Sequence, residues 1–356
     1  MIMRLFQSRH FFPACATILF LAMALVPSVL SFAGAAGGGI AQLYMLNKIG
    51  IYAILALSLN IILGHTGLFH MGHAAFFAVG AYTTAILNTM YSWPIFATMP
   101  VAGVLAAVFA LLVAVPIIHL RGDYLLVVTI GIVEIMRIVL VNNVFGLTGG
   151  ANGIYGIARP VLFGLVLRTP QLQFYLIWGF VTLTIVLFYL LEHSRFGRAL
   201  NYIRYDDIAA SGCGINVSRY KLVAFMVGAF WAGMAGTLYA ANIRTIEPSA
   251  FNFYESVIFF AIVILGGSGN ILGVLVGAFL LVGLQDVFRE FERARMLVFG
   301  AAMMLMMIFR PQGLLPPRRR HYDVDALVGR YPSGLDEGFS LSGRNGKKHA
   351  MEEDTV

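Results

Sequence analysis

The chain has 356 residues, of which 59% are hydrophobic and only 12% are charged, and its mean hydropathy is +0.83. Soluble domains are about a quarter charged and half apolar, so this composition indicates a chain that is solvated by lipid. The net charge of +7 does not indicate a nucleic-acid binder, because the basic residues gather in a few polar loops and in the tail, as in membrane proteins.

Repeated apolar segments predict an all-α polytopic membrane protein with about ten transmembrane helices, some of them short or broken, because a bilayer span needs roughly 20 apolar residues. The segments cover about 11–33, 41–63, 68–90, 95–119, 122–143, 173–191, 220–241, 254–266, 270–287 and 296–310. They divide the chain into an N-terminal end with the first helix (1–40), a transmembrane domain (41–316) and a polar tail (317–356) that we expect to be disordered.

The N-terminal segment has two interpretations. Arg4 and Arg9 precede the apolar run, which places the N-terminus in the cytoplasm. The small residues at 33–35 after the run imitate the cleavage site of a secretory signal. The run is longer than a usual signal core and the rest of the chain is also membrane, so a retained first helix is favoured over a cleaved signal.

Glycines interrupt the chain between the second and third segments, at Gly64, Gly67 and Gly72, followed by His73. Glycine at membrane depth allows helices to approach closely, and unwound backbone is tolerated there when it lines a cavity or is buried in protein. These residues are therefore candidates for the translocation path or its gate, and plain helix packing is the alternative. His70 and His73 would share one helical face, but with no carboxylate or cysteine nearby a metal pair is not expected.

The fifth segment carries two charged residues, Glu134 and Arg137, three positions apart on one predicted helix face. A charge inside a span is costly and is a functional hypothesis by default. The two side chains either neutralise each other or face the translocation path. The segment ends near a cluster of turn residues at 147–153, which we expect outside the cell.

The polar loop at 192–220 lies inside the cell by the count of spans and by its arginines. Apolar and polar residues alternate in it at roughly helical spacing. A short amphipathic helix that docks on a partner would explain this pattern, and a solvated loop is the alternative.

A second glycine-rich stretch, with Gly266 and Gly269, leaves open whether 254–287 is one long helix or two short ones, and so whether the chain has nine or ten spans. Two helices keep the arginine-rich tail in the cytoplasm and are favoured, although Arg289, Arg293 and Arg295 then lie outside; a re-entrant hairpin is the third option. The stretch is similar to 63–80, which suggests a parallel internal repeat, and Gly266 and Gly269 are likewise candidates for the translocation path or its gate.

Several chemical motifs are absent from the sequence. No G-x-x-x-x-G-K-[ST] run is present, so this chain does not hydrolyse ATP by a P-loop. The sequence also has no G-x-S-x-G and no H-E-x-x-H, and its two cysteines, Cys15 and Cys213, offer neither a disulfide framework nor a metal site. We expect no enzymatic activity and no cofactor in this chain.

Short motifs run in a fixed order from about residue 40 to 316. They are Leu59-Asn60-x-x-x-Gly64 with Gly67, Gly72-His73-Ala74-Ala75-Phe76, Gly80-Ala81-Tyr82, Arg121-Gly122-Asp123-Tyr124, Glu134-x-x-Arg137, Leu147-Thr148-Gly149-Gly150 with Asn152-Gly153, Ser194-Arg195-Phe196-Gly197-Arg198, Ile208-Ala209-Ala210 with Gly214-Ile215-Asn216, Tyr220-Lys221, Leu265-Gly266-Gly267-Ser268-Gly269 and Arg310-Pro311-Gln312-Gly313-Leu314. Together they resemble the LivM-type permease of bacterial high-affinity branched-chain amino-acid importers. The N-terminal run matches only as a span, and the tail beyond Pro317 does not match.

The resemblance implies a division of labour between subunits. A second, LivH-type permease would form the pore with this chain in the inner (plasma) membrane, two cytoplasmic ATP-binding subunits would use the ATP, and a periplasmic solute-binding protein would deliver the solute. Ala209, Ala210 and Gly214 resemble the EAA-type loop that couples such permeases to their ATPases. The acidic position of that motif holds Ile208, so Asp206 and Asp207, just before it, are the candidate acids.

Three alternatives to branched-chain amino-acid import stay open. Importers of urea, short-chain amides or aromatic acids use similar permeases, because the binding protein sets much of the specificity. An ion-driven secondary transporter would need an unpaired acid inside the membrane, and Arg137 beside Glu134 weakens that case. A structural membrane scaffold would not need broken helices.

Overall fold

The computed structural model describes residues 39–120, 122–144, 146–162 and 165–287, with short pieces between 300 and 315. The first predicted helix (11–33), most of the tenth (296–310), the three arginines after 287 and the polar tail lie outside the described residues.

The described chain is mainly helical, which confirms the predicted class. Its helices are α3 (Gly39–Asn60), the π-helix η2 (Ile61–His65), α4 (His73–Tyr91), α5 (Ile95–Ile117), α6 (Asp123–Val141), η3 (Gly150–Asn152), α7 (Pro170–His193), α8 (Arg195–Tyr205), α9 (Asp207–Gly212), α10 (Val217–Ile243), η4 (Pro248–Ala250), α11 (Phe253–Gly266) and α12 (Ile271–Val287). Four two-residue strands complete it, namely β1 (Ile154–Tyr155), β2 (Val161–Leu162), β3 (Leu165–Val166) and β4 (Thr245–Ile246).

Among the described residues, six helical segments are long and apolar enough to cross a membrane. They are Ile40–His65, Ile95–Ile117, Asp123–Val141, Pro170–His193, Val217–Ile243 and Pro248–Gly266. α12 is apolar but shorter, and α4, which was predicted as a span, is not among the six. The packing of α4 explains this difference: α4 packs against both α5 and α10 and buries polar side chains such as Thr84, so it needs little lipid-facing apolar surface.

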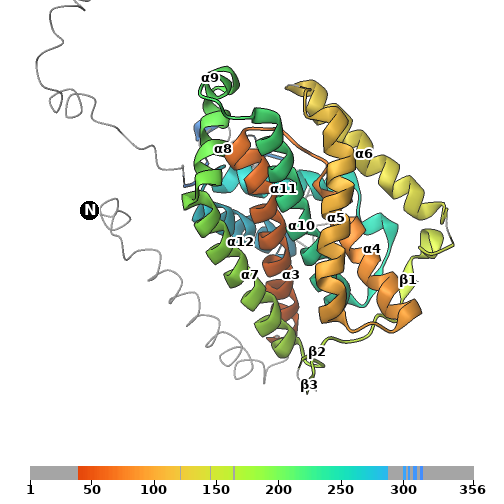
Figure 1. Ribbon diagram of the computed structural model, residues 1–356. Coiled ribbons are helices and arrows are strands. Elements are labelled where there is room, and N and C mark those ends of the chain that lie inside the picture. The colour runs from red at the N-terminus through yellow and green to blue at the C-terminus, as the bar shows by residue number, and fades with distance from the viewer. Residues whose placement is uncertain are drawn as a thin grey trace, which may run out of the picture. The chain divides into compact units, whose positions relative to one another are not determined.

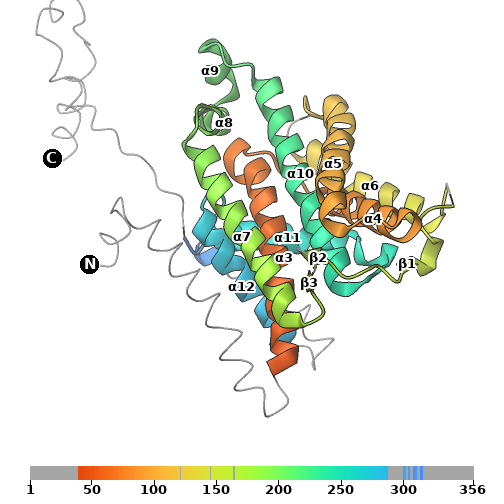
Figure 2. The same ribbon diagram turned by 60° about the horizontal axis from the view of Figure 1, so that its bottom comes forward.

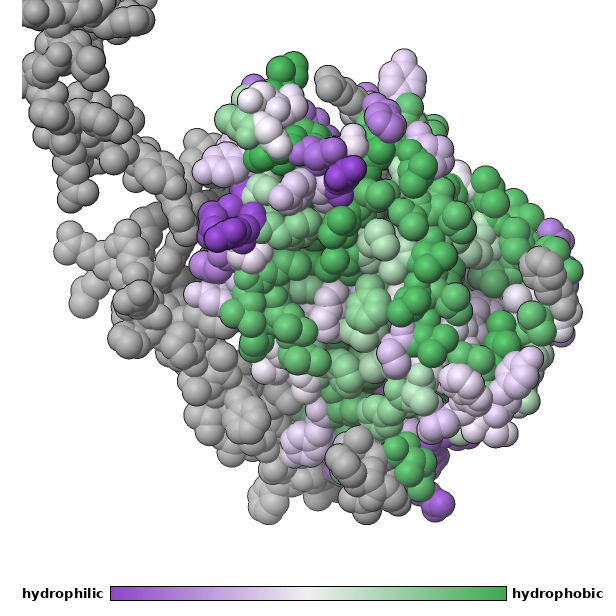
Figure 3. All heavy atoms as spheres, viewed as in Figure 1, coloured by the Kyte–Doolittle hydropathy of each residue, from purple (hydrophilic) through white to green (hydrophobic). Residues whose placement is uncertain are grey.

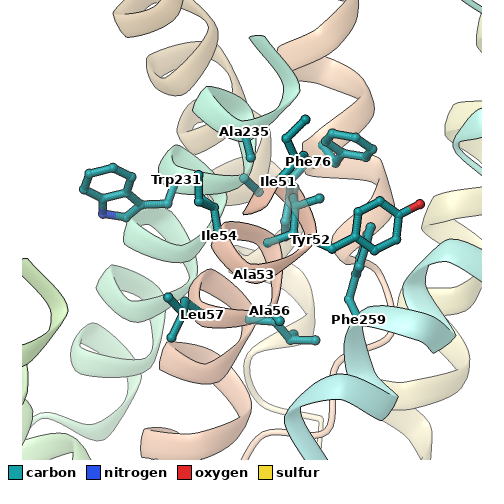
Figure 4. Close-up of a cluster of buried hydrophobic side chains, with 14 of the residues drawn as sticks. Ile51, Tyr52, Ala53, Ile54, Ala56, Leu57, Phe76, Trp231, Ala235 and Phe259 are labelled. Atoms are coloured by element: carbon teal, nitrogen blue, oxygen red, sulfur yellow. The ribbon is translucent and has the colours of Figure 1, made fainter. Parts of the chain in front are cut away.

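The helices form two groups joined by a central pair (Figures 1 and 2). α3, α7 and α12 pack together on one side, and α4 and α5 on the other, with α6 at the edge. α10 and α11 contact both groups and so hold them together. The centre of this packing is a cluster of fully buried side chains from α3, α4, α10 and α11, including Ile54, Phe76, Ala235 and Phe259 (Figure 4).

Small residues bring the backbones of α4 and α10 into contact. A Cβ placed on Gly80 would clash with the backbone of Gly233, and one placed on Gly236 would lie 2.6 Å from the nitrogen of Ala81. Close backbone approach through small residues is the usual way in which membrane helices associate, because lipid offers no hydrophobic drive between them.

The two ends of the molecule differ. α7 leads into α8 and α9 at one end, and α10 returns from there to the other end, where β1 pairs antiparallel with β4 (Ile154 opposite Ile246, Tyr155 opposite Thr245) and β2 with β3 (Figure 1). The turn cluster at 147–153 therefore lies at the end opposite to α8 and α9. Between the ends, hydrophobic side chains cover much of the surface of α5 and α7, as a lipid-facing surface requires (Figure 3).

The region 253–287 consists of two helices, as predicted, broken between Gly266 and Asn270. α11 and α12 pack antiparallel through glycines: a Cβ on Gly266 would clash with Gly273, and one on Gly277 would lie 2.5 Å from the carbonyl oxygen of Ile262. The sequence of this stretch is similar to 63–80, but the two regions pack differently. α11 packs against α12, the helix that follows its break, whereas α4, the helix that follows the first break, packs mainly against α5 and α10. The internal repeat stays a prediction.

Candidate functional site

The first glycine-rich break starts as a change of helix type. α3 continues into the π-helix η2, and the chain leaves the helix at Gly67, whose φ of +72° favours glycine. The Thr66 hydroxyl donates to the carbonyl of Ile62, one turn back. Single π-turns inside α-helices are frequent at functional sites. Residues 61–67 are therefore a candidate functional element.

The two breaks meet in space. The side-chain oxygen of Asn60 accepts a hydrogen bond of 2.8 Å from the backbone N–H of Gly269. Gly64 also packs closely against the backbone of Gly269, because a Cβ added to Gly64 would lie 2.6 Å from the Gly269 nitrogen. Asn60 and Gly64 are buried. The sequence predicted both breaks at one side of the membrane, and their contact agrees with that prediction.

A cation from α8 ties the two breaks to the polar loop. The guanidinium of Arg204 donates to the carbonyl of Gly64 on one side, and on the other to the Ser268 carbonyl at 3.4 Å and the Ser268 hydroxyl at 3.1 Å. The Cγ of Arg204 would also lie 3.4 Å from a Cβ placed on Gly67. Burial lowers the pKa of Arg204, but arginine stays charged at any physiological pH. We call Asn60, Gly64, Gly67, Arg204, Ser268 and Gly269 the break cluster.

A third segment completes the end of α11. The N–H groups of Leu314 and Leu315 donate to the carbonyls of Leu265 (2.8 Å) and Gly266 (3.1 Å), and the Asn270 amide donates to the Leu315 carbonyl. A helix ends with carbonyls that lack intrahelical donors, and here the last residue of the Arg310–Leu314 motif and the residue after it supply the donors.

The predicted amphipathic helix of the polar loop is present as two short helices. Ser194 caps the start of α8, because its hydroxyl accepts from the Gly197 N–H, and α8 buries Leu200 and Ile203. Asn201 of α8 also bonds to His65 of η2. α8 is thus attached to the first break by two side chains, His65–Asn201 and Arg204–Gly64.

The two candidate acids of the polar loop have structural partners in α9 and α10. Asp206 caps α9, because its carboxylate accepts from the N–H groups of Ile208 and Ala209. The carboxylate of Asp207 forms a 2.5 Å ion pair with the ammonium of Lys221, which is buried at the start of α10. Neither arrangement tests a contact with an ATPase.

The remaining residues of the EAA-like run differ in their burial. Ala210 is buried, whereas Ala209 and Gly214 are exposed, and Gly214 has a φ of +81°. Beside them lie two exposed apolar side chains, Tyr205 (79% exposed) and Ile208 (73%). Large apolar groups at a polar end of the molecule are typical of a docking surface.

Gly72 and His73 lie apart from the break cluster and position the start of α4. A Cβ on Gly72 would lie 3.0 Å from the Thr129 carbonyl of α6, and the ring of His73 bonds to the Ser58 hydroxyl at 2.7 Å. His70 does not share a helical face with His73, as the sequence suggested, because α4 begins only at His73. Within the described residues, no group of three or more His, Cys, Asp or Glu side chains could hold a metal ion.

Glu134 and Arg137 form the predicted pair on α6. The Arg137 Nε donates to the Glu134 carboxylate at 2.9 Å, and both side chains are 38% exposed. The pair is therefore local to α6 and partly exposed, and its hydrogen bond does not involve the break cluster.

Sequence reasoning missed part of the polar structure. Asn60 stood inside a matched motif but received no role, and the Gly64 and Ser268 contacts of Arg204 span 140 and 64 residues. A second group of polar contacts that the sequence did not predict lies in the N-terminal half of α3. The hydroxyl of Tyr52 donates to the carboxylate of Glu255 of α11 at 2.7 Å, and the ammonium of Lys48 lies 5.3 Å from the centre of the Tyr52 ring. Lys48 was the available signal, since it is a charge inside a predicted span.

Comparison with known proteins identifies the family. Residues 41–307 match the family described as the permease component of branched-chain amino acid transport systems. The chain is 40% identical over 292 residues to the high-affinity branched-chain amino acid permease LivM of Escherichia coli K12, covering 76% of this chain and 68% of that protein, and 41% identical, with the same coverage, to LivM of Salmonella typhimurium. It is 24% identical to LivH of Salmonella typhimurium, over 74% of this chain and 91% of that protein. No solved structure matches the chain. The chain therefore belongs to the family of membrane permease components of branched-chain amino acid transport systems.

Proposed function

We propose that this chain is the LivM-type permease subunit of an ATP-driven importer for leucine, isoleucine and valine in the bacterial inner membrane. The observation that carries the proposal is the family match, which covers the described helices from α3 to α12 almost entirely. The LivM relatives are named as high-affinity branched-chain amino acid permeases. This chain itself is proposed to catalyse no reaction and to hold no cofactor.

The ATP would be used by two cytoplasmic ATP-binding subunits docked on α9. The exposed Tyr205 and Ile208, next to Ala209 and Gly214, supply an apolar surface for such a partner. The basic residues of α8 and of the start of α10 support placing this end in the cytoplasm, since cytoplasmic loops are rich in Lys and Arg. Both termini would lie on the same side.

The second permease would be of the LivH type and would cover α6. This helix has 22% of its span buried, the least among the six candidate spans, yet it carries the half-exposed Glu134–Arg137 pair. Charges facing lipid are costly, and a second subunit or a solute path along α6 removes that cost. The periplasmic binding protein would dock at the opposite end, where β1 and β4 pair.

The test is uptake of labelled leucine by cells with and without this chain, with unlabelled isoleucine, valine and urea as competitors. Uptake that depends on the chain and is reduced by the branched amino acids is the expected result. Unchanged leucine uptake would overturn the cargo, and labelled urea, amides and aromatic acids would then be tried. A separate purification tests the energy source: ATP-binding subunits that copurify support the ATP-driven importer, and transport by the chain without them would favour an ion-driven transporter.

A further inference from the structure

We propose that Arg204 is the positioning residue that transmits movement of the α8–α9 segment to both helix breaks, so that the three elements move as one unit. The inference rests on the proposed function, because it assumes that a partner ATPase moves α9. It assigns to a single side chain a link between the docking surface and the two interrupted membrane helices.

The geometry of the guanidinium suits this role. Arginine presents five N–H donors in a rigid planar fork, so one side chain can hold two acceptors in a fixed relation. Here the acceptors belong to different elements: the Gly64 carbonyl to η2, and the Ser268 carbonyl and hydroxyl to the α11–α12 break. Gly64 lies in the last turn of its helix, where carbonyls lack donors and the helix dipole favours a cation.

The position of Arg204 in the chain connects it to the docking surface. It lies two residues before Asp206, the cap of α9, and next to the exposed Tyr205. α8 is fixed beneath it by the buried Leu200 and Ile203. A displacement of α9 therefore reaches both breaks through a few covalent bonds and the Arg204 side chain, whereas the Asn201–His65 contact of α8 reaches the first break only.

The two breaks also contact each other without Arg204, through Asn60 and the Gly269 N–H. Their mutual contact should survive loss of the guanidinium. Loss of Arg204 should therefore remove the link of the docking segment to the second break and leave only the Asn201–His65 contact to the first break, rather than dismantle the breaks themselves. This predicts uncoupling, with ATP hydrolysis retained and transport lost, instead of a general loss of stability.

The experiment uses the full transporter, with its partner subunits, reconstituted in lipid vesicles. ATP hydrolysis and leucine uptake are measured together for the wild type, Arg204→Gln, Arg204→Lys and a control, Arg198→Gln. Arg198 lies on the same helix and bears the same charge, but it is exposed and donates to the carbonyl of His193, the last residue of α7. The control separates the contact made by Arg204 from the charge of the loop.

We expect Arg204→Gln to lower uptake per ATP hydrolysed by about tenfold or more, within the usual range of coupling between sites. Arg204→Lys should be intermediate, because lysine keeps the charge but loses the fork, and Arg198→Gln should behave as the wild type. Equal loss of hydrolysis and uptake in Arg204→Gln, or full coupling in it, would overturn the proposal. A wild type without ATP-dependent uptake would instead overturn the proposed function.

A second measurement covers the case in which Arg204→Gln does not assemble. Phe69 lies in the first break and is 49% exposed, so Phe69→Cys, with Cys15 and Cys213 replaced by alanine, reports on that break. We expect its labelling by a membrane-impermeant maleimide to change with nucleotide when Arg204 is present, and to change less with Arg204→Lys. The same nucleotide dependence in both backgrounds would overturn the proposal.

Discussion

The side-chain oxygen of Asn60 accepts a hydrogen bond from the backbone N–H of Gly269, at 2.8 Å, and joins the two interrupted helices directly. Asn60 is buried, with 2% of its surface exposed, so no bulk water replaces the bond when it is lost. The contact makes the two breaks one structural unit, and it is the simplest point at which to test that unit.

Asn60→Ala should lower the free energy of unfolding by about 1–3 kcal/mol, because it leaves a buried N–H without an acceptor. Thermal unfolding of the purified protein measures the effect. Asn142→Ala, at an exposed position after α6, is the control and should leave stability within about 0.5 kcal/mol of the wild type. An Asn60→Ala variant as stable as this control would mean that the contact contributes nothing.

The ion pair of Lys221 and Asp207 predicts an asymmetry between its two single variants. The Lys221 side chain is 9% exposed and that of Asp207 is 29% exposed. Asp207→Ala leaves a buried ammonium unpaired and should destabilise by about 3 kcal/mol, whereas Lys221→Met leaves a carboxylate near water and should cost about 1 kcal/mol or less. Melting temperatures of both variants test this, and the double variant should be more stable than Asp207→Ala alone. Equal effects of the two single variants would contradict the asymmetry.

Gly214→Trp should abolish uptake while leaving the amount of protein in the membrane unchanged. Gly214 has a positive φ and is exposed, and nothing lies within 4 Å of a Cβ added there, so the bulk of tryptophan meets a partner rather than this chain. Gly214→Ala is the matched variant, since it shares the backbone strain of about 1–2 kcal/mol but not the bulk, and it should keep uptake. Retained uptake in Gly214→Trp would remove this loop from the mechanism.

Glu134→Ala should impair uptake or assembly, because it leaves Arg137 unpaired on a membrane helix, at a cost of about 2.5–3.5 kcal/mol. Immunoblots of membranes separate assembly from transport. The double variant Glu134→Gln with Arg137→Gln decides between the two roles of the pair: restored uptake indicates neutralisation, and continued loss indicates a role in the path. Normal uptake by Glu134→Ala would make the pair dispensable.

Local patterns in the sequence were sufficient to predict the helices. The apolar runs gave the described spans to within a few residues, and the mixed pattern after Ser194 indicated helix where α8 and α9 occur. The break after Gly266 followed from its glycines together with the charge of the tail. The capping role of Asp206 also had a local signal, an acid just before a helix.

Contacts between distant segments could not be predicted in the same way. Nothing in the periodicity around Asn60 indicates a partner 209 residues later, and the sites of Arg204 and Gly64 are 140 residues apart. The shared helical face of His70 and His73 was a wrong prediction, because residues 67–72 are not helical and α4 begins only at His73. The roles of the predicted path and coupling residues stay predictions until transport is measured.

The distance in sequence between Asn60 and Gly269 has a consequence for biosynthesis. At a synthesis rate of 5–20 residues per second, residue 269 emerges about 10–40 s after residue 60. During that time α3 already occupies the membrane with a polar side chain that has not met its final partner. The guanidinium of Arg204 arrives earlier than Gly269, so it can hold the Gly64 carbonyl while the last helices are still being made. The order of synthesis therefore assembles this region from α8 toward the final hairpin of α11 and α12.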